Sequence, residues 1–210
     1  MDIILASNSS RRKDIFRVLL PQYRSVNPAC SELSPLLYNR HEISFFTFQN
    51  AQLKANCVWE NTFLKNALVI GCDTAIATAT GIVGKPFNTA SAFAMLKDLS
   101  DTSHLVVSSV AILRILSGCV VQRIGFSEPT KVTFSALCDA AIQSYVTTNK
   151  PFDKAGAYGI QEIPSSFIAS IEGSVWNVIG FPVETFCDVM DSLGVPYKEI
   201  TNEYNFINRG

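Results

Sequence analysis

Apolar and polar positions alternate along the chain in short blocks whose spacing predicts both strands and helices. Residues 3–6 form an apolar run typical of a buried strand, and the polar residues 7–10 form a loop that leads into a helix over 11–20. Between residues 42 and 63, large apolar side chains recur at three- and four-residue steps, which predicts a long helix. The chain therefore opens with a strand, a polar loop and a helix start.

Strands and helices remain mixed through the rest of the chain. The apolar run 67–70 predicts a buried strand that ends at Gly71-Cys72-Asp73. The other elements expected, in chain order, are short strands at 75–77 and 82–83 around a glycine-containing turn, a helix over 91–99, antiparallel strands over 105–116 and 118–124, a strand near 131–135, a helix near 139–147, a glycine-rich loop, and a helix over 183–193. Hairpins and crossovers both occur, so we expect an α/β fold with a mixed sheet flanked by helices.

Length and composition favour one compact domain. A chain of 210 residues with 48% hydrophobic content can bury about 70% of its extended surface, so it can fold without disulfides or structural metals. We expect a single domain over residues 1–210, and this domain could consist of two lobes. The six cysteines are far apart and include no C-x-x-C pair, which argues against zinc-ribbon and thioredoxin folds and predicts reduced core thiols.

The charge balance limits the kinds of partner. A net charge of -1 leaves no field strong enough to hold nucleic acid by counterion release, although Lys and Arg side chains focused in one cleft could bind a small phosphate ligand. The basic residues near the N-terminus follow the first apolar run, which is the reverse of a secretory signal. No apolar run reaches the ~18 residues that span a bilayer. We therefore expect no membrane partner and a cytoplasmic location.

The first cluster that could carry chemistry is Leu5-Ala6-Ser7-Asn8-Ser9-Ser10-Arg11-Arg12. A helix N-terminus offers unpaired N–H groups, and Arg11 and Arg12 add donors suited to phosphate oxygens. The alternative is a serine cap followed by two solvated arginines.

The second cluster pairs Asp73-Thr74 with Gly84-Lys85-Pro86. A carboxylate at Asp73 could hold a divalent cation or orient water, and Lys85 could neutralise phosphate charge. Alternatively, Asp73 only ends a strand and Lys85 is a surface charge.

The third cluster is the run from Asp153 to Gln161, where two glycines permit close backbone approach beside polar and aromatic side chains. Gln161 could read a nucleotide base or be an ordinary hydrogen-bonded amide. Elsewhere, Lys54 on the long helix and Glu32 in a loop would usually be solvated. The two histidines lack a Cys or Ser partner at a recognisable spacing, so a hydrolase triad is not supported.

Together the three clusters resemble the Maf family, whose pattern is L-A-S-x-S-P-R-R, then D-T with a following G-K-P, then D-K-A-G-x-Y-x-I-Q. The order and spacing fit, and the resemblance covers nearly the whole chain. The departures from the pattern are Ser10 for proline, Asp101 for glycine, Ser174 for aspartate and Phe181 for leucine.

The resemblance implies a fold like that of inosine triphosphate pyrophosphatases, with a long mixed sheet, two lobes around a cleft and a homodimeric assembly. It also implies that Asp73 is the catalytic acid/base and that Glu32 and Asp73 hold a divalent cation, Mg²⁺ or Mn²⁺. The triphosphate would be bound by Ser7, Arg11, Arg12, Lys54 and Lys85.

The resemblance implies a reaction as well, the hydrolysis of a nucleoside triphosphate to the monophosphate and pyrophosphate by attack of water on the α-phosphorus. Members with this chain's Arg11, Thr74 and Gln161 are associated with dTTP and UTP, whereas a subgroup with an aromatic residue at the first arginine prefers 7-methyl-GTP. The family is also linked to inhibition of septum formation, so the alternative is a non-catalytic nucleotide sensor that regulates cell division. A third alternative is an inert structural domain.

Overall fold

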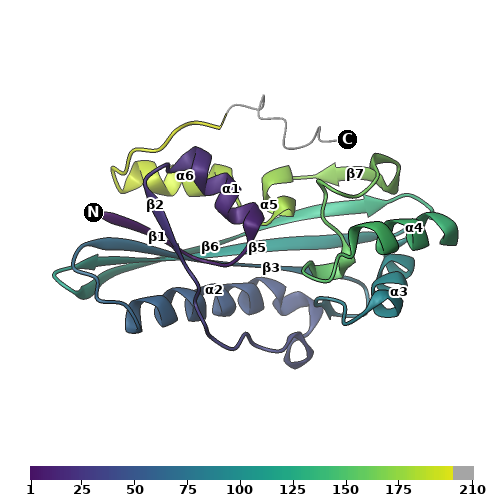
Figure 1. The fold of residues 1–210 in the computed structure, drawn as a ribbon, viewed down its shortest axis with the longest axis horizontal. Helices are drawn as coiled ribbons and strands as arrows, with labels where there is room; N and C mark the ends of the chain where they lie inside the picture. Colours follow the sequence, from purple (N-terminus) through teal and green to yellow (C-terminus); the bar gives the residue numbers. More distant parts are fainter. Residues whose placement is uncertain (201–210) are drawn as a thin grey trace.

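The computed structural model describes residues 1–200, which fold around one mixed sheet of seven strands with helices on both faces (Figure 1). The strands are β1 (Asp2–Ala6), β2 (Tyr23–Val26), β3 (Ala67–Ala77), β4 (Ile82–Val83), β5 (Ser103–Leu116), β6 (Cys119–Phe134) and β7 (Ile168–Glu172). The helices are α1 (Ser10–Leu19), α2 (Ile43–Glu60), α3 (Thr89–Leu99), α4 (Asp139–Asn149), α5 (Val175–Ile179) and α6 (Val183–Ser192), with 3-10 turns at Pro35–Leu37, Arg40–Glu42, Ala155–Ala157 and Ser165–Phe167. The predicted domain also included residues 201–210, which lie outside the described residues.

The sheet confirms the predicted mixture of parallel and antiparallel strands. Its order is β2-β1-β3-β5-β6-β7, with β4 paired to the end of β3. Strand β1 runs parallel to both β2 and β3, and the remaining pairs are antiparallel. The helices predicted at 11–20, 42–63, 91–99, 139–147 and 183–193 are present with ends shifted by a few residues.

Two strand boundaries were predicted wrongly, both at polar residues. Strand β3 continues past Asp73 to Ala77, because every residue from 67 to 77 is paired with the longer β5. The predicted strands at 118–124 and 131–135 are one strand, β6. Its middle is polar because β7 pairs only with residues 131–134, which leaves the outer side of the preceding stretch without a neighbouring strand. Pro129 fits in that stretch because its missing N–H costs no bond on the unpaired side.

The short elements β2, β7 and α5 were not predicted. Each has only four or five residues, and most positions of β2 and β7 are partly or fully exposed. Such segments show little hydrophobic periodicity. The other elements were predicted from that periodicity.

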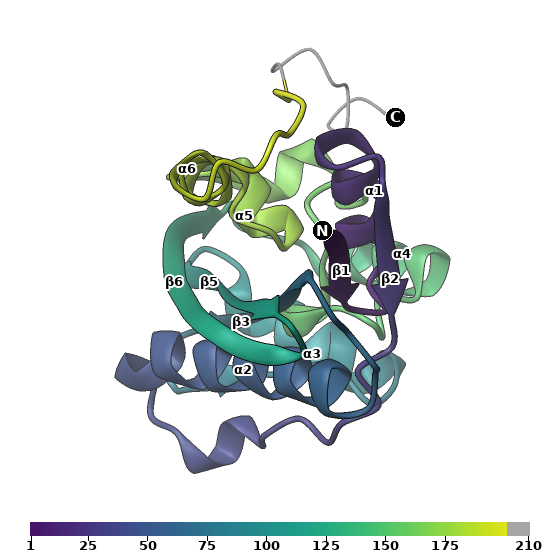
Figure 2. The ribbon, with the colours of Figure 1, turned by 90° about the vertical axis from the view of Figure 1, so that its left-hand side faces the viewer.

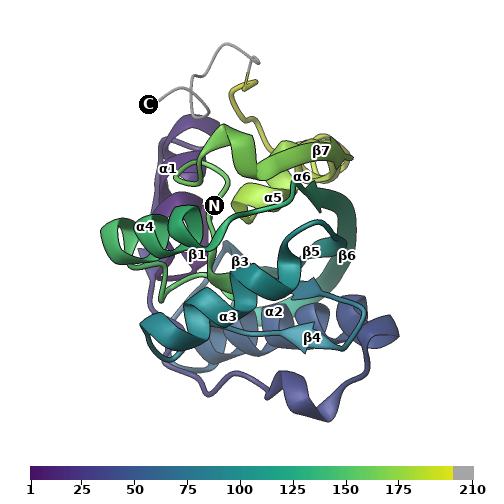
Figure 3. The same ribbon diagram turned by 90° about the vertical axis from the view of Figure 1, so that its right-hand side faces the viewer.

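Helices cover both faces of the sheet (Figures 1 and 2). Strand residues alternate between two apolar layers, one on each face. Leu5, Leu68 and Ile70 pack with α1, α5 and α6 on one face. Ile4 and Val69, their neighbours in sequence, pack with α2 on the opposite face. This period of two is what a sheet buried on both sides requires. A third cluster joins α3 and α4 to the far ends of β5 and β6 (Figure 3).

All six cysteines are free, but the prediction of core thiols is correct only for Cys72. Cys119 and Cys138 are exposed and the other three are half-buried. No helix within residues 1–200 combines the length and apolar character needed to cross a bilayer.

Helix α2 touches β3 most closely at Gly71. A Cβ atom at this position would lie 2.1 Å from the carbonyl oxygen of Ala51 and 2.9 Å from the amide nitrogen of Ala55. Both contacts are to helix backbone, which cannot rotate away as a side chain could. Only glycine allows the helix to lie this close to the strand.

We predict that Gly71→Ala lowers the free energy of unfolding by about 2 kcal/mol or more, because the added methyl group must push α2 away from the sheet. Urea denaturation measures the change. Gly84→Ala is the matched control, since its Cβ would meet only Pro35 at 3.6 Å, an ordinary contact. Equal stability of Gly71→Ala and the wild type would contradict the close packing.

Candidate active site

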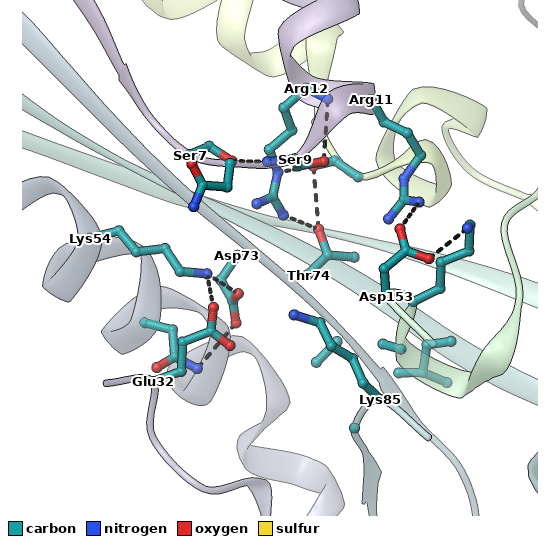
Figure 4. Close-up of a pocket in the computed structure, with 18 of the residues that line it drawn as sticks. Ser7, Ser9, Arg11, Arg12, Glu32, Lys54, Asp73, Thr74, Lys85 and Asp153 are labelled. Carbon is teal, nitrogen blue, oxygen red and sulfur yellow. Dashed lines mark hydrogen bonds and ion pairs between the residues drawn. The ribbon is translucent and has the colours of Figure 1, made fainter. Parts of the chain in front are cut away.

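A cavity of about 790 Å³ opens between the β1–α1 loop, α2, the middle of β3 and the loop over residues 153–160 (Figure 4). It is the cleft that the resemblance predicts. Eight of the nine residues proposed from the sequence as site residues line it: Ser7, Arg11, Arg12, Glu32, Lys54, Asp73, Thr74 and Lys85.

A buried ion pair forms the floor of the cavity. The Lys54 ammonium on α2 lies 2.6 Å from Asp73 Oδ1 on β3 and 2.9 Å from Glu32 Oε1. Asn50, one helical turn before Lys54, donates from Nδ2 to Asp73 Oδ2 at 3.1 Å. Lys54 and Asp73 are 6% and 7% exposed, so water screens their attraction little. The two carboxylates proposed as metal ligands are thus held together by one lysine.

The charges of this cluster stabilise one another. Burial alone would lower the pKa of Lys54, but Asp73 and Glu32 outweigh it and the pKa is raised. Burial would likewise raise the pKa of Glu32, yet Lys54, with help from Lys85 and Arg12, lowers it. Lys54 is therefore an ammonium and Glu32 a carboxylate at neutral pH.

Asp73 retains capacity for a further partner. Each carboxylate oxygen can accept about two hydrogen bonds. Oδ1 accepts from Lys54 and Oδ2 from Asn50, which leaves lone pairs on both atoms. Because Asp73 lines the cavity, these lone pairs are available to a water molecule or a cation.

Arg12 is fixed in place by the backbone and by β3. Its Nε donates to the carbonyl oxygen of Gly180 at 2.8 Å, and its Nη2 donates to Thr74 Oγ1 at 2.9 Å. A guanidinium has five N–H groups, so three remain for a ligand. Arg12 is 9% exposed and lines the cavity, which rules out the alternative of a solvated arginine.

A buried polar network supports Thr74 from below. The Thr74 hydroxyl is 2.8 Å from that of Ser108, whose Oγ donates to the carbonyl oxygen of Asn177 at 2.9 Å. The Asn177 amide in turn donates to Val106 and Thr130. Thr74 lines the cavity, and its hydroxyl also holds the guanidinium of Arg12.

Two further cations face the cavity from opposite sides. Arg11 pairs with Asp153 at 3.3 Å, and its side chain is 24% exposed. Lys85 is exposed, and its ammonium points into the cavity toward Asp73 in Figure 4. Among the described residues, Lys85 makes no ion pair or side-chain hydrogen bond, and its charge is free for a ligand.

The start of α1 forms the remaining wall. Ser9 caps the helix by accepting from the Arg12 N–H at 3.4 Å, as the capping alternative proposed. Ser7 is buried, and its hydroxyl accepts from the Ser9 N–H at 3.2 Å. The first turn of α1 therefore adds a partial positive charge near Arg11 and Arg12.

Gln161 is the one proposed site residue that does not line the cavity. The wall at this point is formed by Tyr158, Gly159 and Ile160, and Gln161 is half-exposed beyond them. The structure does not test its predicted role as a base reader, which stays a prediction. The loop turns through 3-10 geometry at 155–157, so which side chains face inward could not be counted along the sequence.

Sequence reasoning missed Asn50, Ser108 and Asn177. Asn50 had a usable signal, because residues four apart on a helix share a face and Lys54 was already a candidate. Ser108 and Asn177 had none, since their partners lie far away in the sequence.

The site thus combines a buried acid, an ammonium held against it, and several cations around one cavity, on an α/β fold with a mixed sheet. That combination suits a compact polyanion and a water molecule. The chain belongs to the Maf-like protein family, whose model matches residues 2–193.

Its relatives are similar over nearly their whole length. A protein of Clostridium botulinum (strain Okra / Type B1) is 37% identical over 92% of this chain and 98% of its own. A protein of Thermosipho melanesiensis is 35% identical over 90% of this chain and 97% of its own. Both are named dTTP/UTP pyrophosphatase. Among solved structures, a nucleoside-triphosphatase / dITP/XTP pyrophosphatase of Mycobacterium abscessus is 14% identical over 92% of this chain and 95% of that chain, with a TM-score of 0.43.

We predict that Lys54→Met lowers the free energy of unfolding by about 3 kcal/mol, because it leaves the Asp73 charge buried without its cation. Lys54→Met combined with Asp73→Asn should recover most of the loss, since the uncompensated charge is then gone. Urea denaturation at pH 7 compares the variants. Lys97→Met, which removes an exposed lysine paired with Asp139, should change stability by less than about 1 kcal/mol. A double variant no more stable than Lys54→Met would contradict the account.

Proposed function

We propose that this protein hydrolyses nucleoside triphosphates to the monophosphate and pyrophosphate, with UTP and dTTP as its preferred substrates. The observation that carries the proposal is Asp73, held by Lys54 on the floor of a cavity that Arg11, Arg12 and Lys85 also line. The names of the relatives support the same activity and favour catalysis over a non-catalytic sensor.

The cations around the cavity would bind the triphosphate. Arg12 offers three unused N–H groups, which suit the paired oxygens of a phosphate. Lys85 offers an unpaired ammonium, and α1 directs its N-terminus to the same region. Arg11 would exchange Asp153, an exposed carboxylate, for a phosphate oxygen.

Asp73 would act on the attacking water. One of its free lone pairs accepts the water proton as the water oxygen bonds to the α-phosphorus and the bond to the bridging oxygen breaks. The electron pair of that bond leaves with pyrophosphate, whose charge the nearby cations stabilise. Lys54 keeps Asp73 oriented for this step.

A divalent cation, Mg²⁺ or Mn²⁺, fits the donors present. Residues 1–200 contain no cluster of three or more His, Cys, Asp or Glu side chains that could hold a metal alone. Mg²⁺ commonly binds one or two carboxylates together with substrate phosphates, which matches Glu32 and Asp73. When bound, the ion would neutralise phosphate charge. A homodimer remains a prediction from the resemblance, and a cytoplasmic location remains a prediction from the pattern of charged and apolar residues in the sequence.

Preference among bases would come from the wall formed by Tyr158, Gly159 and Ile160, which also line the cavity. UTP and dTTP share an N3–H donor and an O4 acceptor, whereas CTP presents the opposite pattern at those atoms. A mismatched base would leave buried polar groups unpaired, at a cost of about 1–3 kcal/mol each.

We predict that the wild type releases pyrophosphate from UTP and dTTP with a kcat/KM at least about tenfold above that for CTP or GTP. Asp73→Asn should lower turnover by about 100-fold or more while remaining folded. A panel of nucleotides, with pyrophosphatase and phosphate detection, measures both. Near-wild-type turnover of Asp73→Asn would remove Asp73 from the mechanism, and equal rates for all four nucleotides would contradict the base preference.

We also predict that metal-stripped protein is inactive on UTP and that Mg²⁺ or Mn²⁺ restores turnover, because the cation that Glu32 and Asp73 would hold neutralises phosphate charge beside these two carboxylates. EDTA treatment followed by titration of each metal measures the effect. Zn²⁺ is the comparison ion, since no Cys or His ligand is present among the lining residues apart from Cys30. Full activity without metal would contradict the proposal.

A further inference from the structure

The loop over residues 153–160 is hydrogen-bonded to the main chain directly beside Lys85. The Gly156 N–H donates to the carbonyl oxygen of Gly84 at 3.0 Å. Gly84 directly precedes Lys85, whose own side chain has no ion-pair partner in the described part of the chain. The backbone hydrogen bond from Gly156 therefore restrains the main chain from which the Lys85 side chain extends.

The conformation of this loop needs support from outside. Gly156 and Ala157 have φ angles of +66° and +60°, in the left-handed region that a non-glycine residue adopts only at an energetic cost. A Cβ at Gly156 would lie 2.6 Å from Ile76 Cδ1, so the loop also packs tightly against β3. Two consecutive left-handed residues persist only where neighbouring contacts hold them.

Tyr158, the next residue, supplies such a contact. Its hydroxyl is 2.7 Å from Nε2 of His104, which lies on β5 in the sheet. The two side chains are 5% and 3% exposed, and the Tyr158 ring packs edge-on against Phe134 with centroids 5.0 Å apart. Burial lowers the pKa of His104 to about 4, so the imidazole is neutral at working pH.

The neighbouring cation Arg11 is held by a different contact. Arg11 pairs with Asp153, and Asp153 is bound by the buried Lys154 at 2.7 Å. Lys154 also binds Glu162 at 3.0 Å, and its carbon chain lies over Gly159. The loop therefore has two anchors. The one at Tyr158 is in direct contact with Gly156, since a Cβ at Gly156 would lie 3.6 Å from Cδ1 of the Tyr158 ring.

We propose that His104 and Tyr158 are positioning residues. Through the Gly156–Gly84 hydrogen bond, they hold Lys85 where its ammonium can bind the polyphosphate of a nucleotide. The proposal rests on the proposed function for the identity of the ligand. Neither residue is placed on the reacting atoms. Their effect should pass through Lys85 and leave the contribution of Arg11 unchanged.

A double-mutant cycle tests this route. The probe is uridine 5′-(α,β-imido)triphosphate, which is not hydrolysed between the α- and β-phosphates, and calorimetry measures its Kd alongside kcat/KM for UTP. We expect Tyr158→Phe to raise the Kd about three- to tenfold, the usual worth of one hydrogen bond. In a Lys85→Ala background the same change should cost less than about twofold, whereas in an Arg11→Ala background it should keep its full effect.

Variants at His104 separate positioning from general stability. His104→Gln retains a partner for the Tyr158 hydroxyl and should bind within about twofold of the wild type, while His104→Leu should match Tyr158→Phe. Combining His104→Leu with Tyr158→Phe removes both polar groups and should be no worse than either alone. Tyr23→Phe, which removes a hydroxyl bonded to Lys13 away from the cavity, is the tyrosine control.

The outcomes distinguish the two proposals. An equal cost of Tyr158→Phe in the wild-type and Lys85→Ala backgrounds would overturn the positioning role, as would a wild-type Kd for Tyr158→Phe. A wild type that binds the imido analogue but does not turn over UTP would remove the proposed hydrolysis, and the binding cycle would still decide the role of His104 and Tyr158.

Discussion

Helix α2 lies on β3 at a distance that only a glycine permits, and this contact determines where the charges of the cavity can be. Because Gly71 has no side chain, the backbone of α2 at Ala51 and Ala55 approaches the strand directly. Asn50 and Lys54 then reach Asp73, two residues further along β3. A buried carboxylate without such partners would be costly, so the packing and the ion pair depend on each other.

The other charged groups come from elements that the sheet brings together. Arg12 enters from α1 and is held by Gly180 and Thr74, while Lys85 follows the hairpin that β4 makes with β3. Acidic groups therefore lie on the floor of the cavity and cations around it, an arrangement suited to a phosphate chain whose reacting end meets Asp73.

Hydrophobic periodicity was sufficient to predict the long helices and the mixed sheet, because their buried residues recur at regular short spacings in the sequence. It failed where polar residues continue a strand. Asp73 in β3 is satisfied by Lys54 and Asn50, which no local pattern reveals. The three clusters predicted from the sequence do converge on one cavity, but Gln161 lies outside the lining because the preceding turn is irregular. Asn177 is buried and hydrogen-bonded to β5, and it was missed because no local pattern in the sequence reveals its partner.

Hydrolysis of UTP in ¹⁸O-labelled water tests the central claim most directly, because the label marks the phosphorus that water attacks. With Asp73 acting on water at the α-phosphorus, the products should be UMP and pyrophosphate, with the label in UMP. Label in pyrophosphate, or formation of UDP and phosphate, would contradict the account.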